Sequence, residues 1–276
     1  MSEKYALLIG CNYKNIPDCR LYGCINDIKN MQNMLVSNIK FKPENITMIH
    51  DELTGDMVPT RSTILRELTN IVQKSNNASE IWIHYSGHGS QVVDKNHDEK
   101  SGYDSCIVPV DFIDAGFIID DDILNIIKGI KCPAMILSDS CHSGTVCDLP
   151  YSIEYMYGTM FRYTRNNTVV ITNPKIIMMS GCKDSQTSAD FYDTQHGRSE
   201  GAFTDAFLRS LKQNNYNASL TKIYVDTYNW LANNQFSQKP ILSSSTAVPS
   251  WLFGGVNTRG VNTIRPNKKN KMKMVF

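Results

Sequence analysis

The sequence predicts an α/β protein, a three-layer α/β/α sandwich with a mostly parallel central sheet. Short apolar runs that end in turn residues are typical of interior parallel strands, and residues 81–86 and 134–139 are the clearest of them. Between such runs, apolar residues recur at helical spacing. Strands that alternate with helices predict βαβ units and a parallel sheet. A length of 276 residues with 41% hydrophobic residues is enough for a substantial core.

The first half of the chain alternates regularly between expected strands and helices. We expect strands over residues 5–10, 45–49, 80–86 and 134–139, and short extended pieces over 105–110 and 117–119. Cys24, Ile28, Met31 and Leu35 repeat at helical spacing and predict one helix. A second helix follows Thr60, a suitable N-cap residue, and a third begins at the acidic residues 120–122, which suit a helix N-terminus.

The second half is less regular. Residues 149–173 lose the pattern and are rich in Tyr, Thr and Asn, which predicts a surface loop or linker. A strand over 175–180, helices over 203–211 and 223–231, and a late strand over 239–243 follow. We therefore expect a single domain, made of a larger part over 4–150, a linker over 151–173, a smaller part over 174–254 and a basic tail over 255–276.

Composition excludes several classes of protein. The net charge of +1 argues neither for nor against nucleic-acid binding, and because no basic stripe stands out, no nucleic-acid partner is expected. The basic residues 268–273 are interpreted as a frayed terminus. No apolar run approaches 18 residues, so no membrane span is expected, and the N-terminus does not resemble a signal peptide. Eight cysteines are too few for a disulfide framework and indicate a reducing, cytoplasmic location.

Two residues with catalytic chemistry follow two of the expected interior strands. His88 lies just after residues 80–86, and Cys141 lies just after residues 134–139. Chemistry in open α/β sheets collects beyond the carboxyl ends of parallel strands. A thiol and an imidazole brought to that edge are a candidate nucleophile and a candidate base. His84, four residues before His88, lies within an expected strand and is not interpreted as a metal ligand.

The segments around these residues carry a resemblance to a known family. Residues 85–89 read YSGHG and residues 139–144 read DSCHSG, and both resemble the catalytic blocks of the metacaspases, cysteine peptidases of the caspase-like fold. Four further blocks resemble the family in the same order, so the resemblance covers roughly residues 4–252; they are residues 23–27, 104–111, 180–189 and 201–204. The surroundings of Cys141 differ from the Gln-Ala-Cys pattern of caspases proper. The short linker resembles the type I group, without the long N-terminal extension of many members.

The resemblance implies the roles of the catalytic residues. Cys141 is expected to be the nucleophile, and His88 the base that later protonates the leaving amine. The backbone N–H groups of Gly89 and Cys141 are the implied oxyanion donors. The alternative interpretation, without a catalytic role, is that Cys141 is a buried structural cysteine and that His88 is a strand-end histidine that makes a backbone hydrogen bond.

The resemblance also implies the substrate preference. It maps Asp27, Ser86 and Asp139 onto the S1 pocket, where two carboxylates would favour the cationic side chain of Arg or Lys and repel the Asp that caspases accept. The alternative for Asp27 is a residue of a helical first turn, and for Asp139 a carboxylate that caps nearby amides at a strand end.

Calcium is the implied cofactor, and self-processing is the implied regulation. The resemblance maps Asp104, Asp120, Asp121 and Asp148 onto the family's calcium site. Simple N-capping of the helix that follows, or a solvated loop acid, would explain the same residues without a metal. Exposed irregular segments are where chains are nicked, so self-cleavage is expected after Arg162 or Arg165 in the linker.

The sequence therefore predicts a monomeric, calcium-dependent cysteine endopeptidase that acts on proteins or peptides with Arg or Lys at P1. Two alternatives from other classes stay open. One is a non-proteolytic scaffold of the same fold that binds partner or misfolded chains. The other is a zinc- or calcium-binding signalling module without catalysis, although the cysteines before Asp27 lack paired zinc-ligand spacing.

Overall fold

An eight-stranded sheet forms the centre of the computed structural model, which describes residues 3–95, 102–141, 146–158, 160–181, 190–193, 198–251 and 253. The strand order is β2-β1-β3-β7-β10-β13-β8-β9. The first five of these strands are parallel; they are β2 (Ile46–His50), β1 (Glu3–Gly10), β3 (Ala78–Ser86), β7 (Ala134–Asp139) and β10 (Ile176–Ser180). The last three are antiparallel additions, namely β13 (Ile241–Ser244), β8 (Tyr151–Tyr157) and β9 (Met160–Arg165).

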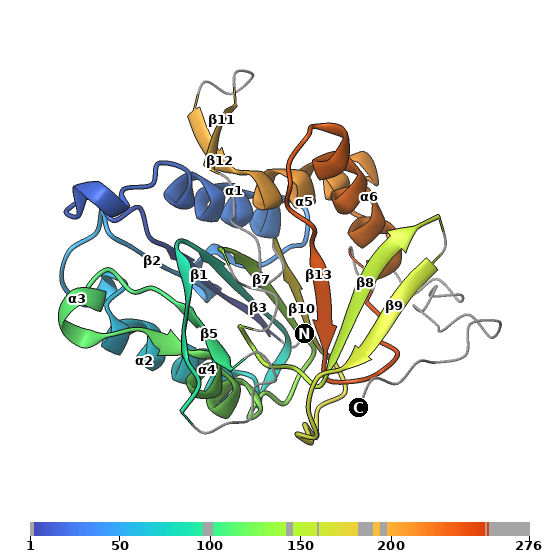
Figure 1. Cartoon of the computed structure of the whole chain (residues 1–276), viewed down its shortest axis with the longest axis horizontal. Coiled ribbons are helices and arrows are strands. Elements are labelled where there is room, and N and C mark those ends of the chain that lie inside the picture. The colour runs from blue at the N-terminus through green and yellow to red at the C-terminus, as the bar shows by residue number, and fades with distance from the viewer. Residues whose placement is uncertain are drawn as a thin grey trace.

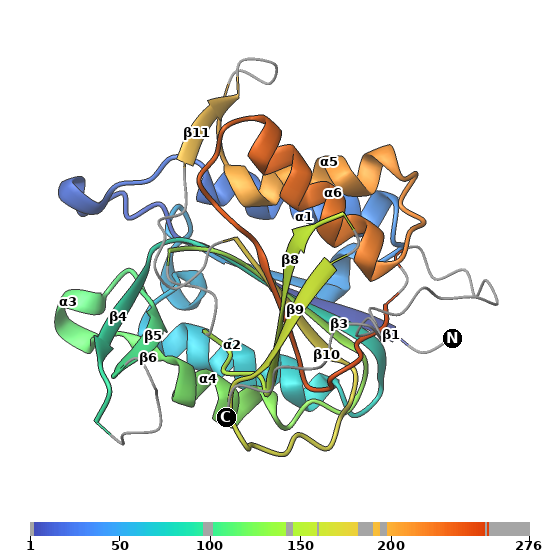
Figure 2. The same cartoon turned by 45° about the vertical axis from the view of Figure 1, so that its right-hand side comes forward.

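Helices cover both faces of the sheet, which gives the expected three-layer α/β/α architecture (Figures 1 and 2). One face carries α1 (Cys24–Ser37), α5 (Ala202–Gln213) and α6 (Leu220–Asn233). The other carries α2 (Arg61–Lys74) and α4 (Asp120–Ile127), with the short α3 (Phe112–Ala115) at one side. The predicted α/β class with a mostly parallel sheet is confirmed.

Each face of the sheet has its own hydrophobic core because successive strand residues point to opposite faces. Leu8, Trp82 and Met135 belong to the core under α1, α5 and α6. Ile9, Ile83 and Ile136 belong to the core under α2 and α4. Burial on both faces explains why β1, β3 and β7 are continuous apolar runs without polar alternation.

Two smaller sheets lie at the edge of the central sheet where its parallel strands have their carboxyl ends. A three-stranded sheet is formed by β4 (Gly89–Val93), β5 (Tyr103–Ile107) and β6 (Ile118–Ile119), and a two-stranded ribbon by β11 (Asp190–Asp193) and β12 (Arg198–Gly201). Three short 3-10 turns cover Pro17–Cys19, Pro43–Asn45 and Gly55–Met57. The predicted N-cap is confirmed, since the side chain of Thr60 accepts the N–H of Thr63.

The predicted linker over 151–173 is wrong for its first two thirds, because β8 and β9 occupy residues 151–157 and 160–165. These strands form a hairpin whose outer strand is the edge of the sheet. Edge strands are partly exposed, so they lack the apolar run that identifies an interior strand, while their Tyr and Thr residues have high strand propensity. Residues 166–173 are irregular, as expected. Within the described residues, no helix combines the length and hydrophobicity that crossing a membrane requires.

Candidate active site

The parallel pairing of β3 with β7 brings His88 and Cys141 to the same edge of the sheet. Ser86 lies opposite Asp139 in this pair, and the N–H of Gly87 donates to the carbonyl of Asp139 at 3.2 Å. His88 and Cys141 each follow their strand's last paired residue by two positions, so they extend equally far beyond the sheet. Both side chains are half-buried, which leaves each accessible to a substrate at this edge.

Gly89 provides direct evidence that the two segments touch. A Cβ built on Gly89 would lie 1.9 Å from the carbonyl oxygen of Cys141 and 3.2 Å from Oγ of Ser140. Any side chain at this position would therefore push the main chain of Cys141 away. The glycine permits the close approach of the two backbones that bear the thiol and the imidazole.

A backbone carbonyl defines the tautomer of His88. Nε2 of His88 lies 2.7 Å from the carbonyl oxygen of Cys19, in the turn that follows β1. A carbonyl oxygen only accepts hydrogen bonds, so Nε2 carries the proton and Nδ1 is the nitrogen left to act as a base. Sequence analysis missed this contact because a backbone atom leaves no signal in residue identity.

The three predicted S1 residues also come together. Asp27 lies in the first turn of α1 and is 1% exposed, and Asp139 ends β7 and is 4% exposed. Oγ of Ser86 donates to Oδ2 of Asp27 at 2.7 Å. A Cβ built on Gly201 would lie 2.6 Å from Oδ2 of Asp27 and 2.3 Å from Oδ2 of Asp139, so both carboxylates face the same point.

The start of α5 holds this acidic pair in place. The N–H of Gly201 donates to Oδ1 of Asp27 at 2.9 Å, while the N–H and hydroxyl of Thr204 both donate to Oδ2 of Asp139 at 2.9 Å. These donors are neutral, so they orient the carboxylates without cancelling their charge. Gly201 and Thr204 belong to a block that sequence analysis singled out, but their contacts depend on tertiary structure.

His84 contacts the side chain of Thr204. Its Nε2 lies 3.3 Å from Oγ1 of Thr204, and its Nδ1 has no hydrogen-bond partner among the described residues. Burial lowers the pKa of His84 to about 3, so the ring is neutral near pH 7. Through Thr204, His84 adds a contact to the acidic pair that the sequence did not indicate.

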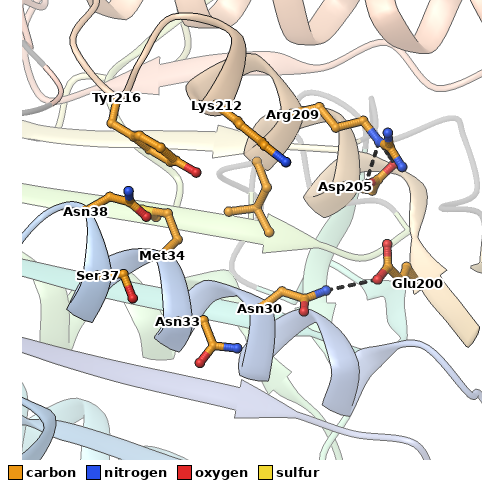
Figure 3. A pocket seen from close by; sticks show the side chains of 11 residues that line it. Asn30, Asn33, Met34, Ser37, Asn38, Glu200, Asp205, Arg209, Lys212 and Tyr216 are labelled. Carbon is orange, nitrogen blue, oxygen red and sulfur yellow. Dashed lines mark hydrogen bonds and ion pairs between the residues drawn. The ribbon is translucent and has the colours of Figure 1, made fainter. Parts of the chain in front are cut away.

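A polar cavity of about 370 Å³ lies between α1 and α5, next to this junction (Figure 3). Nδ2 of Asn30 donates to Oε1 of Glu200 at 3.0 Å, and Nδ2 of Asn26 donates to the carbonyl of Ser199 at 2.9 Å. These bonds fasten β12 to α1 and thereby fix Gly201 beside Asp27. Neither His88 nor Cys141 lines the cavity.

The four predicted calcium ligands are only partly gathered. Asp104, Asp120 and Asp148 are buried, and Asp121 is half-buried. Asp120, the first residue of α4, accepts the N–H of Ser105 at 2.8 Å and of Asp121 at 3.0 Å. Oδ1 of Asp148 accepts from the side chain of Asn167 at 2.7 Å. Within the part of the chain that is described, no three His, Cys, Asp or Glu side chains are arranged to hold a metal ion.

Three of these carboxylates contribute to the raised pKa values of two buried cysteines. Burial is the main cause that raises the pKa of Cys106 to about 12, and the charges of Asp120 and Asp104 add to it. Burial likewise raises the pKa of Cys147, with additions from Asp120 and Asp148. The oxygen donors suit calcium, but they must draw closer to form a coordination sphere.

The two predicted self-cleavage sites lie in an edge strand and not in a loop. Arg162 is in the middle of β9, where it lies opposite Glu154 and forms an ion pair with it at 3.7 Å. Arg165 ends β9, and its Nε donates to the carbonyl of Asn167 at 3.2 Å.

Comparisons with known proteins identify the family of this chain. The sequence profile described as "Metacaspase, peptidase C14 domain" matches residues 4–150. Metacaspase-1B of Neosartorya fischeri is 31% identical over 92% of this chain and 72% of its own length, and Metacaspase-1 of Kluyveromyces lactis is 34% identical over 91% and 68%. Metacaspase-1A of Neurospora crassa is 34% identical over 88% of this chain and 63% of its own length.

Solved structures share the fold at low sequence identity. The protein GSU0716 from Geobacter sulfurreducens has a TM-score of 0.61 at 22% identity and covers 88% of this chain and 93% of its own. Caspase-1 from Spodoptera frugiperda has a TM-score of 0.51 at 11% identity and covers 88% and 87%. The caspase-like architecture is therefore confirmed.

The low pKa of His84 predicts a pH-dependent stability. An unfolded histidine binds a proton below its usual pKa near 6.5, whereas buried His84 stays neutral down to about 3. The contribution of neutral His84 to the free energy of unfolding is thus complete above pH 6.5 and is lost as the pH falls. The free energy of unfolding then decreases by at most ~1.4 kcal/mol per pH unit. Urea unfolding of wild type and His84→Gln from pH 7.5 to 4.5 should show a smaller loss for the variant. Parallel stability curves would contradict this prediction.

Proposed function

Because this chain belongs to the metacaspase family of cysteine peptidases, we propose that Cys141 and His88 form its catalytic dyad and that it cuts after Arg or Lys. The observation that supports the dyad is the packing of Gly89 against the main chain of Cys141, because the segment that follows His88 contacts the segment that bears the thiol. Seven cysteines are described, and Cys141 and Cys19 are the two that are not fully buried. Of these two, Cys141 lies directly after a central strand.

The proposed reaction begins with proton transfer from the thiol of Cys141 to Nδ1 of His88. The carbonyl of Cys19 accepts the N–H of Nε2 at 2.7 Å and stabilises the imidazolium that forms. The thiolate attacks the substrate carbonyl, and the backbone N–H groups of Gly89 and Cys141 stabilise the oxyanion. His88 then gives its proton to the leaving amine. Water hydrolyses the thioester with His88 as base, which restores the thiol.

The proposed preference for Arg or Lys rests on the acidic pair. Asp27 and Asp139 direct two buried carboxylates at one point, and their hydrogen-bond donors from Ser86, Gly201 and Thr204 are neutral. A substrate cation would compensate this charge, and a guanidinium matches carboxylates geometrically. A substrate Asp would add a third negative charge in a place shielded from water, which is strongly unfavourable.

A kinetic comparison tests the dyad and the preference together. Wild type should hydrolyse a fluorogenic peptide ending in Arg and not the matched peptide ending in Asp, and Cys141→Ala and His88→Ala should be inactive. Asp139→Asn and Asp27→Asn should each lower kcat/KM for the Arg peptide by about tenfold or more, as expected for losing a charge-assisted bond. Asp205→Asn is the matched control, because Asp205 is also buried but pairs with Arg209.

Hydrolysis of neither peptide by folded wild type would reject the peptidase and favour the scaffold alternative. Equal hydrolysis of the Arg peptide by wild type and Asp139→Asn would reject the role of the acidic pair while leaving the dyad intact.

We propose that Asp104, Asp120, Asp121 and Asp148 are the ligands of a bound calcium ion. The support is the burial of Asp104, Asp120 and Asp148 and the bond from the N–H of Ser105 to Oδ2 of Asp120, which holds Asp120 beside the residue that follows Asp104. A hard cation would relieve the repulsion between such carboxylates. When bound, calcium would neutralise this charge. The four aspartates would supply the oxygen ligands, and the hydrogen bond from Asn167 to Oδ1 of Asp148 would break when Asp148 binds the ion.

Calorimetric titration of calcium into Cys141→Ala protein tests this site without any contribution from activity. We expect saturable binding that Asp120→Asn weakens by about tenfold or more, since each ligand carboxylate contributes charge. Asp122→Asn is the control, because Asp122 lies in the same turn but pairs with Arg61 at 2.8 Å. No saturable heat in the parent protein would remove the proposal.

Self-cleavage is proposed after Arg165 in preference to Arg162. The bond after Arg162 lies inside β9, so cutting it requires the hairpin to open, whereas Arg165 is the last residue of the strand. Intact mass spectrometry of calcium-treated wild type should show cleavage after residue 165. Arg165→Ala should prevent that cut and Arg162→Ala should not, with Cys141→Ala as the uncut control. Unchanged intact mass of active wild type would contradict self-processing.

A further inference from the structure

We propose that Tyr13 and Tyr85 are positioning residues that hold the backbone of His88 from both sides. The proposal rests on His88 acting as the base. Oη of Tyr13 accepts the N–H of His88 at 2.9 Å, and Oη of Tyr85 donates to the carbonyl of His88 at 2.6 Å. The two polar backbone groups of one residue are thus both bound by tyrosine hydroxyls.

The protons of the two hydroxyls can be assigned. Tyr13 donates its proton to the carbonyl of Val108 at 2.6 Å, and Tyr85 donates its own to His88. The two hydroxyl oxygens lie 3.2 Å apart, but each hydroxyl has one proton, and that proton is already donated in the shorter bond. Burial raises the pKa of each tyrosine well above its usual value, so both remain neutral donors near pH 7. Val108 completes the arrangement by donating its N–H to the carbonyl of His88 at 3.1 Å.

Tyr13 also contacts the imidazole itself. The two ring centroids lie 4.7 Å apart with an interplanar angle of 34°. The same loop supplies the Cys19 carbonyl that accepts from Nε2. One loop therefore fixes the main chain, the ring face and the tautomer of the base.

The loop adopts a conformation that is unfavourable on its own. Tyr13 has a φ of 52°, in the left-handed region that side chains other than glycine rarely adopt. Its neighbours are anchored by Asp51, whose two oxygens accept the N–H groups of Asn12 and Lys14 at 2.9 Å each. Unfavourable backbone geometry that surrounding contacts enforce clusters at functional sites.

The position of the Tyr85 side chain requires a glycine at residue 87. A Cβ built on Gly87 would lie 2.6 Å from Oη of Tyr85, so a glycine is needed for this side chain to turn back onto the carbonyl of His88. Ordinary core packing of two tyrosines would not require both hydroxyls to meet the same residue.

The experiment compares Tyr13→Phe and Tyr85→Phe with Tyr224→Phe. Tyr224 is an equally buried tyrosine whose hydroxyl meets the carbonyls of Ile153 and Pro240 at 2.9 Å, on the far side of the sheet from α2. It is therefore a matched loss of one buried hydroxyl away from His88. For each protein, kcat and KM on the Arg peptide, the thermal midpoint and the rate of Cys141 alkylation by iodoacetamide are measured.

Tyr13→Phe and Tyr85→Phe should each lower kcat by about tenfold or more with KM changed by less than about twofold, because a misplaced base slows chemistry and not binding. Both should slow alkylation of Cys141, whose thiolate depends on His88. Tyr224→Phe should lower the thermal midpoint by a similar amount but leave kcat and alkylation unchanged.

Wild-type kcat and alkylation in folded Tyr13→Phe and Tyr85→Phe would overturn the proposal, and so would equal losses in Tyr224→Phe. If one variant does not fold, the other decides, since each removes a bond to His88. Wild-type protein that hydrolyses no peptide would count against the proposed function, while the alkylation rates would still judge the positioning role.

Discussion

The parallel pairing of β3 with β7 is the constraint on which the site depends. Because Ser86 and Asp139 are opposite each other, the two segments that follow leave the sheet side by side, and Gly89 fits against the main chain of Cys141. The same register puts Ser86 and Asp139 next to Asp27. A shift of one residue would reverse the direction of every side chain on the strand and would separate both the dyad and the acidic pair.

The groups that orient this edge come from elsewhere in the chain. The loop after β1 carries Tyr13 and the Cys19 carbonyl to His88, and it is anchored by Asp51 just beyond β2. The start of α5 carries Gly201 and Thr204 to the acidic pair. A rigid sheet thus supplies position, while the loop after β1 and the start of α5 supply orientation, which is how the side chains of a functional site are held close to their working geometry.

The interior strands could be predicted from the sequence because burial on both faces leaves a continuous apolar run, as in residues 134–139. The hairpin of β8 and β9 could not, because a half-exposed edge strand carries no such run. His88 with Cys141 and Asp27 with Asp139 were singled out from their motifs. The structure brings the segments of the first pair to one edge of the sheet and the carboxylates of the second pair to one point. The Cys19 carbonyl, and the contacts of Tyr13 and Thr204, depend on tertiary structure and on backbone atoms, which residue patterns do not report.

The most direct test of the account is covalent labelling with a peptide chloromethyl ketone that carries Arg at P1, whose chloride is displaced by the attacking thiolate, followed by peptide mapping. One molecule of inhibitor should attach to Cys141, and the His88→Ala variant should react far more slowly at the same residue. Attachment to another cysteine, or equal rates of labelling with and without the imidazole, would contradict the central claim that these two residues work together at one edge of the sheet.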